Sequence, residues 1–150
     1  MLTLPPDFND FIQLLNSYQV EYLLIGGYAV ALHGHVRFTQ DMDVWVCTNP
    51  ENAKKVVHVL KDFGLTQADE LLDILQKENR VVGMGVPPIK IEVVTTISGV
   101  AFEECYQNRR VVDIDGLSIN YLSLDDLRKN KLASGRPKDL ADLDSLPEEE

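Results

Sequence analysis

Two short apolar runs, one ending in a pair of glycines and one carrying a pair of carboxylates, constrain this sequence more than any other feature. The first run covers residues 22–25 and stops at Gly26 and Gly27. The second carries Asp41 and Asp43, which flank a single methionine. Because side chains alternate between the two faces of a strand, both aspartates must point to the same face.

Two neighbouring carboxylates on one face repel each other unless a cation neutralises them. Mg²⁺, or Mn²⁺ in its place, binds oxygen ligands and suits such a pair. An isolated Asp-x-Asp is more often a pair of solvated side chains than a metal site. Here the preceding glycines let the backbone approach a ligand closely, and the helix start after them offers unpaired N–H groups to a phosphate. The combination predicts a site that handles nucleoside triphosphates.

The order of these motifs resembles the nucleotidyltransferase superfamily that includes DNA polymerase beta. The resemblance is carried by G-G and then T-x-D-x-D on the next strand, which are Gly26, Gly27, Thr39, Asp41 and Asp43. In that family the glycines grip the triphosphate and the two aspartates ligate the metal. The resemblance therefore implies nucleotide binding at the glycines and the threonine, metal binding and catalysis at the aspartates, NTP as the substrate, and Mg²⁺ or Mn²⁺ as the cofactor.

A third carboxylate, Glu92, lies on a later alternating run at residues 89–94. A single glutamate on a strand usually faces solvent. In the resembling family a third acidic residue, most often Asp, lies on the strand of matching order. The resemblance thus implies that Glu92 completes the metal site or takes the proton of the attacking hydroxyl. The longer glutamate arm departs from the family pattern.

Basic residues are concentrated between positions 128 and 138. Five of the fourteen Lys and Arg residues lie there: Arg128, Lys129, Lys131, Arg136 and Lys138. One interpretation is a solvated helix end whose cations complement the helix dipole. In a chain of net charge −10, such a concentration favours a bound anion instead, and we expect this anion to be the triphosphate.

The same segment resembles a C-terminal motif, K-x-x-x-x-R-x-K-D-x-x-D, of a small bacterial subgroup. That subgroup is related to the nucleotidyltransferase toxins of abortive-infection and toxin–antitoxin systems. There the lysine contacts the nucleotide and an aspartate is needed for activity. Position by position, the resemblance implies nucleotide binding by Lys131, Arg136 and Lys138, a catalytic role for Asp139, and a role for Asp142 at the end of the motif. Since such toxins occur in toxin–antitoxin systems, the resemblance also leaves open that this chain binds a partner protein.

Composition predicts one soluble domain. With 150 residues, of which 45% are hydrophobic, the chain is long enough to bury a sizeable core. We find no apolar run of bilayer length and no secretory pattern at the N-terminus, so we expect a cytoplasmic protein without membrane contact. Cys47 and Cys105 lack metal-like spacing and are expected to be free thiols. The acidic charge disfavours a broad nucleic-acid surface but leaves a local basic groove open.

Hydrophobic periodicity predicts an α/β (α+β) fold, with a small, mixed, twisted sheet flanked by helices. We expect one nucleotidyltransferase-like domain over residues 1–150, with a core at about 20–122 and a C-terminal helical segment at about 123–147. Expected helices cover residues 5–18, 28–33, 51–63, 69–76, 100–108, 124–133 and 138–146. Expected strands cover residues 22–25, 41–47, 80–86, 89–95, 111–114 and 117–121, the last two joined at Asp115 and Gly116.

Two functions remain open at this stage. The first is a Mg²⁺-dependent nucleotidyltransferase that moves a nucleoside monophosphate from an NTP to an acceptor hydroxyl and releases pyrophosphate. The second is a catalytically degenerate domain of toxin–antitoxin type that binds nucleotide or a partner protein without turnover. The intact glycine and aspartate motifs favour the first, whereas Glu92 and the small size of the chain favour the second. The acceptor could be a tRNA, a protein or a small molecule.

Overall fold

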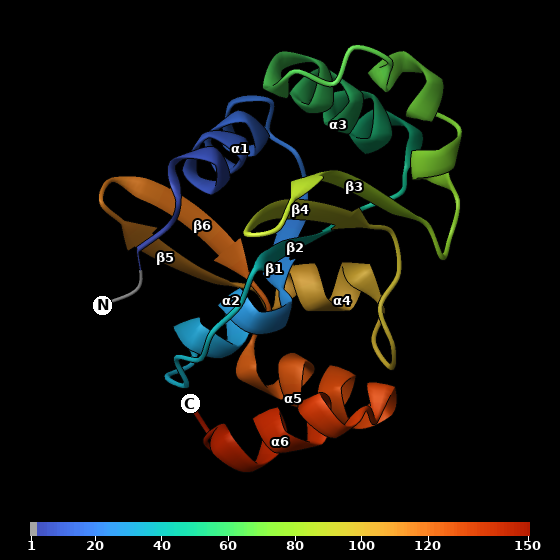
Figure 1. Ribbon diagram of the computed structural model, residues 1–150. Coiled ribbons are helices and arrows are strands. Elements are labelled where there is room, and N and C mark those ends of the chain that lie inside the picture. Colours follow the sequence, from blue (N-terminus) through green and yellow to red (C-terminus); the bar gives the residue numbers. More distant parts are fainter. Residues whose placement is uncertain (1–2) are drawn as a thin grey trace.

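The computed structural model of the chain describes residues 3–150, in which a six-stranded mixed sheet has helices on both faces (Figure 1). The strands are β1 (Tyr22–Ile25), β2 (Asp41–Val46), β3 (Val81–Val86), β4 (Ile89–Val94), β5 (Arg110–Ile114) and β6 (Leu117–Tyr121). Their spatial order is β3-β4-β2-β1-β6-β5. The strand β2 runs antiparallel to β1 and parallel to β4. The strand that carries the aspartate pair is therefore hydrogen-bonded along both of its edges.

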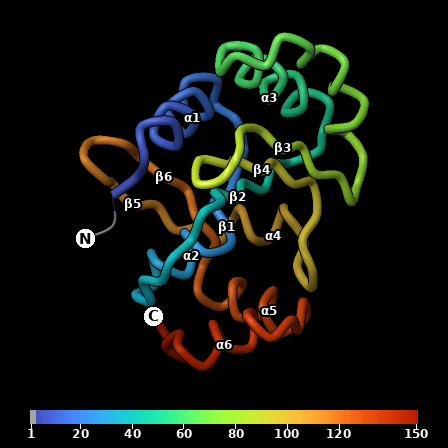
Figure 2. Tube along the Cα trace, in the orientation of Figure 1, coloured from blue at the N-terminus to red at the C-terminus, as the bar shows by residue number. Residues whose placement is uncertain are grey.

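Helices cover the two faces of this sheet unequally. They are α1 (Pro6–Ser17), α2 (Gly26–Leu32), α3 (Pro50–Phe63), α4 (Phe102–Gln107), α5 (Leu124–Ser134) and α6 (Pro137–Ser145). One face packs against α1 and α3, the other faces α2, α4 and α5, and α6 packs against α5 (Figures 1 and 2). This arrangement confirms the expected fold class, a mixed sheet flanked by helices with further helices at the C-terminus.

Side-chain alternation along β1 and β2 determines where the aspartates lie. Leu24 and Val44 belong to the core beneath α1 and α3, whereas Trp45 belongs to the core on the opposite face. Trp45 is 1% exposed, and its indole N–H donates to the carbonyl oxygen of Thr95 at 3.2 Å. By alternation the two aspartates share the face of Trp45. The same face of β2 is thus apolar core at one end and carboxylate at the other.

Outside residues 69–76, the elements begin and end within two residues of the expected positions, and local chain signals mark several of these ends. The Asn49 side chain caps the start of α3, and Gly64 ends that helix with a φ of +118°. Ser123 caps α5 by accepting a hydrogen bond from a backbone N–H of its first turn. At the β5–β6 turn, Asp115 and Gly116 have φ values of +53° and +87°, as a two-residue hairpin with this twist requires.

The helix expected over residues 69–76 is wrong. The structure has two short 3₁₀ turns there, η1 (Ala68–Leu71) and η2 (Ile74–Gln76). Within these turns only Ala68 and Leu75 are buried. Nucleating an α-helix is costly, and a short segment with so little buried surface does not offset that cost.

The expectations about cysteines and membrane contact can also be compared with the structure. Cys47 and Cys105 are buried and free, as the sequence predicts. Within residues 3–150, none of the helices combines the length and the apolar character needed to cross a bilayer.

Candidate active site

Gly26 and Gly27 open α2 directly at the end of β1, two residues before the helix start expected from the sequence. Gly26 has a φ of +67°, and a Cβ on it would lie 2.6 Å from Oδ2 of Asp43. A Cβ on Gly27 would lie 2.6 Å from Oγ1 of Thr39. Any side chain at either position would displace a residue of the Asp-x-Asp strand or the segment before it, so the close approach requires glycine.

The three carboxylates expected at the site come from two adjacent strands. Asp41 and Asp43 begin β2, and Glu92 is the register partner of Asp43 on β4. Oδ1 of Asp41 is buried and has no hydrogen-bond partner among the described residues. Burial, followed by the charges of Glu92 and Asp41, raises the pKa of Asp43 to about 6, although Lys138 and Lys131 act in the opposite direction. A bound cation would satisfy the orphaned oxygen and favour the ionised form of both aspartates.

Glu92 has a neighbour that the sequence analysis did not consider. Its Oε1 lies 2.9 Å from Nζ of Lys90, two residues earlier on β4. Within residues 3–150, no three His, Cys, Asp or Glu side chains form a group that could hold a metal ion. The ligands that the geometry provides for a metal are therefore Asp41 and Asp43. A direct ligand role for Glu92 stays a prediction. A pair is enough for Mg²⁺, which usually takes one or two carboxylates and completes its shell with water and substrate phosphates.

Five charged side chains form an ion cluster: Arg37, Lys131, Arg136, Asp139 and Asp142. We call it the buried ion cluster because its centre, Lys131 with Asp139 and Asp142, is buried, although Arg37 is only partly buried and Arg136 is exposed. Nζ of Lys131 lies 3.1 Å from a carboxylate oxygen of both Asp139 and Asp142. Nε of Arg136 lies 2.7 Å from Asp139. Arg37 contacts both oxygens of Asp142, at 2.8 and 2.9 Å. The cluster fastens the loop before β2 to the C-terminal helices.

Asp139, expected among the catalytic residues, lies at the centre of this cluster. Its exposure is 0%, and it accepts hydrogen bonds from Lys131 and Arg136. Burial alone would raise the pKa of Asp139, but its hydrogen bonds, foremost that from Arg136, hold the pKa well below its usual range. An enclosed, ionised carboxylate orients its cations instead of touching substrate. The geometry favours a positioning role for Asp139, whereas the resemblance predicts a catalytic one.

The glycine turn, the aspartate pair and the basic segment line one cavity of about 370 Å³. Its lining comprises Gly26, Gly27, Arg37, Phe38, Thr39, Gln40, Asp41, Asp43, Lys131, Arg136 and Lys138. A second cavity, of about 410 Å³, shares Gly26, Asp43, Lys131 and Arg136 with the first and takes in Glu92. The site residues expected from the sequence therefore line one of these two cavities, except Asp139 and Asp142.

The segment between the two motifs contributes side chains that sequence reasoning missed. Arg37 and Phe38 line the first cavity, and Lys90 pairs with Glu92 beside the second. The available signal was an Arg-Phe pair directly before Thr39 in a loop flanked by both motifs. Nothing local in the sequence shows that Arg37 pairs with Asp142, 105 residues away.

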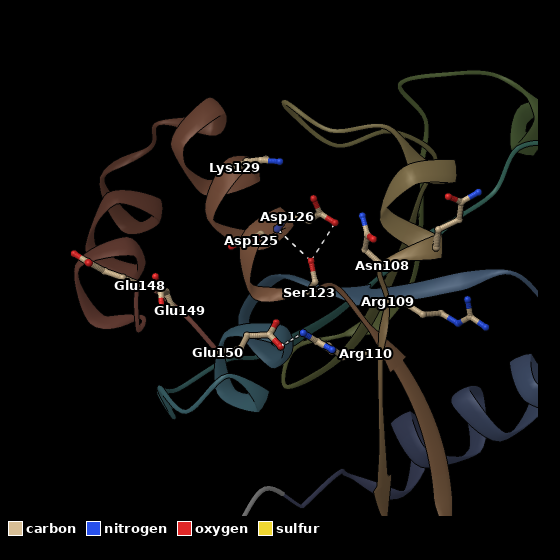
Figure 3. Close-up of a pocket in the computed structure, with 11 residues that line it drawn as sticks. Asn108, Arg109, Arg110, Ser123, Asp125, Asp126, Lys129, Glu148, Glu149 and Glu150 are labelled. Carbon is tan, nitrogen blue, oxygen red and sulfur yellow. Dashed lines mark hydrogen bonds and ion pairs between the residues drawn. The ribbon is translucent and has the colours of Figure 1, made fainter.

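A larger cavity, of about 780 Å³, lies at the start of α5 beside the C-terminal residues (Figure 3). Charges of both signs line it, among them Arg110, Lys129 and Asp125. The Glu150 carboxylate pairs there with Arg110 and accepts a hydrogen bond from the backbone N–H of Leu124 at 2.8 Å. Its lining has more carboxylates than cations, which is unsuited to a triphosphate, and it contains none of the glycine, aspartate or glutamate residues expected at the site. We therefore place the candidate site in the glycine–aspartate cavity.

Comparison with known proteins identifies the family and the fold of this chain. The family model described as nucleotidyltransferase of unknown function (DUF6036) matches residues 4–146. No curated protein matches the sequence. A provisionally assigned nucleotidyltransferase from Thermotoga maritima has a TM-score of 0.63 at 18% identity, covering 95% of this chain and 94% of its own. An antigenic nucleotidyltransferase-like protein from Paracoccidioides brasiliensis has a TM-score of 0.56 at 18% identity, covering 91% and 72%. These structures share the fold of this chain.

The first prediction concerns Asp43. Its pKa rises from the ordinary 3.8 to about 6 on folding, so the folded state holds the proton more tightly. The proton on Asp43 therefore stabilises the folded state. This contribution is complete below pH 3.8 and is lost as the pH rises through 6, where the buried carboxyl ionises and the parent becomes less stable than a variant with a neutral side chain. In EDTA at about pH 8, Asp43→Asn should therefore gain up to about 3 kcal/mol in unfolding free energy, and the gain should vanish near about pH 4. Thermal unfolding measures it, with the exposed Asp125→Asn as control; a gain that does not change with pH would contradict the account.

The second prediction concerns the buried ion cluster. Asp139→Asn leaves the buried Lys131 short of a charged partner, which typically costs about 3 kcal/mol or more. In a chain of this length the melting temperature should fall by about 6–12 °C. Because the pKa of Asp139 is lowered in the fold, the difference should shrink as the pH falls below the ordinary pKa of aspartate. Asp144→Asn, exposed on the same helix, is the matched control, and equal melting temperatures of the two variants would exclude this role.

Proposed function

Because the chain belongs to the family of nucleotidyltransferases of unknown function (DUF6036), we propose that it transfers a nucleoside monophosphate from an NTP to an acceptor hydroxyl and releases pyrophosphate. The observation that carries this proposal is the 370 Å³ cavity in which Gly26, Gly27, Asp41 and Asp43 face Lys138. A turn without side chains, a carboxylate pair and a lysine surround a single space. Phosphate binding and metal binding both need these groups, and they need them together.

Cations on one side of the cavity would hold the triphosphate. Lys138 is exposed, and the Arg136 side chain is 61% exposed although it is hydrogen-bonded to Asp139. The ammonium group of Lys131 has three N–H donors. Two of them point to Asp139 and Asp142, which leaves the third for a ligand in the cavity. Charge-assisted hydrogen bonds to phosphate oxygens are among the strongest that side chains make.

The aspartate pair fits a divalent cation. Oδ1 of Asp41 is buried without a partner, and Asp43 resists ionisation while it stands beside two other carboxylates. A Mg²⁺ ion held by Asp41 and Asp43 would neutralise charge on the phosphates and lower the pKa of the acceptor hydroxyl. Gly26, packed against Asp43, keeps the phosphate-binding turn and the metal-binding strand in direct contact.

In the transfer step the acceptor oxygen forms a bond to the α-phosphorus, and the bond from that phosphorus to the pyrophosphate oxygen breaks. The hydroxyl proton must pass to a base. We assign this role to Glu92, because it is the register neighbour of Asp43 and lines the cavity next to the triphosphate site. Lys90 engages Oε1 of Glu92, so the proton goes to Oε2.

A domain that binds nucleotide without turnover is the second candidate. The contact between Lys90 and Glu92 favours it, since it occupies one oxygen of the carboxylate that the transfer step would use as its base. The likeness of residues 131–142 to the toxin-type subgroup, and the partner protein that this likeness implies, belong to the same proposal. A transfer assay separates the two candidates, because only the enzyme releases pyrophosphate.

The third prediction tests the metal pair. Asp41→Asn and Asp43→Asn should each abolish Mg²⁺-dependent NTP binding, because each removes a charge that the cation needs. Isothermal titration calorimetry with and without Mg²⁺ measures this. Asp125→Asn, an exposed aspartate outside the cavity, should bind NTP like the parent. Unchanged Mg²⁺ dependence in both site variants would remove the aspartate pair from the site.

The fourth prediction tests Glu92. Glu92→Gln should keep NTP affinity nearly intact and slow nucleotidyl transfer by roughly 10²- to 10⁴-fold, the usual worth of general-base assistance. Glu92→Asp should retain much of the activity, because a carboxylate remains. Pyrophosphate release and transfer of radiolabelled nucleoside monophosphate give the rates, and calorimetry gives the affinity. Full transfer by Glu92→Gln would mean that another group takes the proton.

A further inference from the structure

An exposed aromatic side chain stands at the proposed nucleotide cavity without a packing role. Phe38 lines the cavity and is 80% exposed, the highest value for any large apolar side chain among residues 3–150. Holding so much apolar surface in water is unfavourable. Within the described lining of the cavity, Phe38 is also the one apolar side chain. A ligand in this cavity that has a flat apolar part therefore finds its largest apolar partner in Phe38.

The chain on both sides of Phe38 is held in place. On one side, Arg37 makes two hydrogen bonds to the buried Asp142, and its Nη1 donates to the carbonyl oxygen of Phe38 at 3.3 Å. On the other side, Thr39 packs against Gly27 and donates from Oγ1 to the backbone oxygen of Asp41 at 3.3 Å. The position of Phe38 relative to the glycine turn is thus set before a ligand arrives, which lowers the entropic cost of binding.

We propose that Phe38 is the stacking platform for the nucleobase of the bound NTP. This inference rests on the proposed function and assigns the part of the nucleotide that the glycines, aspartates and lysines leave unbound. The charged groups of the cavity suit the phosphates and the metal, whereas a base offers a flat π-face that an aromatic ring can cover. Stacking accepts every base, so the platform provides affinity with little choice among NTPs.

Val36 supplies a matched control on the same segment. It is 69% exposed, comparable with Phe38, but it does not line the cavity. A protein that docked on the exposed apolar surface of this loop would use both side chains. A nucleobase in the cavity would use Phe38 alone.

The test compares affinities measured by calorimetry in Mg²⁺ for ATP, GTP, CTP, UTP and inorganic tripolyphosphate, which has no base. The proteins are the parent, Phe38→Ala, Phe38→Trp and Val36→Ala. For the NTP that the parent binds most tightly, Phe38→Ala should weaken binding by about 5- to 150-fold, the usual loss for one stacked base. Tripolyphosphate should bind the parent and Phe38→Ala equally. Phe38→Trp should retain NTP affinity, and Val36→Ala should leave it unchanged.

Any other result overturns the inference, and the pattern of affinities shows whether the proposed function fails with it. If the parent binds NTP and Phe38→Ala binds it equally well, the base does not stack on Phe38, although the proposed function stands. Equal weakening of NTP and tripolyphosphate would mean that Phe38 supports the phosphate site. Weakening by Val36→Ala as well would mean that the loop, and not the ring, matters. If the parent binds neither NTP nor tripolyphosphate, the proposed function fails and the nucleobase platform with it.

Discussion

The rest of the site depends on the cost of keeping two carboxylates side by side at the edge of the core. Asp41 and Asp43 stand at the start of an interior strand, on the face that Trp45 fills with apolar core. One carboxylate oxygen is orphaned and the other aspartate holds its proton to about pH 6. Such an arrangement destabilises a protein at neutral pH unless something positive occupies the site. We infer that bound Mg²⁺ would remove this destabilisation, which makes binding of the ion, and of NTP with it, more favourable.

The buried ion cluster explains why the C-terminal helices are part of the site. Arg37 reaches α6 from the loop before β2, and Lys131 reaches it from α5, so that Asp142 joins this loop to both C-terminal helices. Lys131, Asp139 and Asp142 each have two charged partners, so breaking any one contact would leave a buried charge with one partner in place of two. The cluster thereby fixes the loop that carries Phe38 and directs Lys131 and Arg136 toward the cavity. The cluster thus holds the cationic groups of Lys131 and Arg136 in fixed positions beside the cavity, where a ligand can contact them.

The sequence predicted those features that depend on local rules. Strand alternation placed both aspartates on one face, and Asp115 and Gly116 marked the turn between β5 and β6. It failed where tertiary contacts decide. No periodicity reveals that the buried Asp139 pairs with Lys131 and Arg136, nor that Arg37 pairs with a residue 105 positions away. The helix expected at residues 69–76 failed for a related reason, because apolar spacing alone did not show how little of it is buried.

The central claim is that Asp41 and Asp43 hold a divalent cation beside a triphosphate on the glycine turn. A crystal structure of the protein with Mn²⁺ and a non-hydrolysable NTP tests it most directly, because anomalous scattering locates the metal independently of the protein atoms. We predict an anomalous peak coordinated by Asp41 and Asp43, with the triphosphate between Gly26, Gly27 and Lys138 in the 370 Å³ cavity. An ordered nucleotide in another cavity, or a Mn²⁺ peak that neither aspartate contacts, would contradict it.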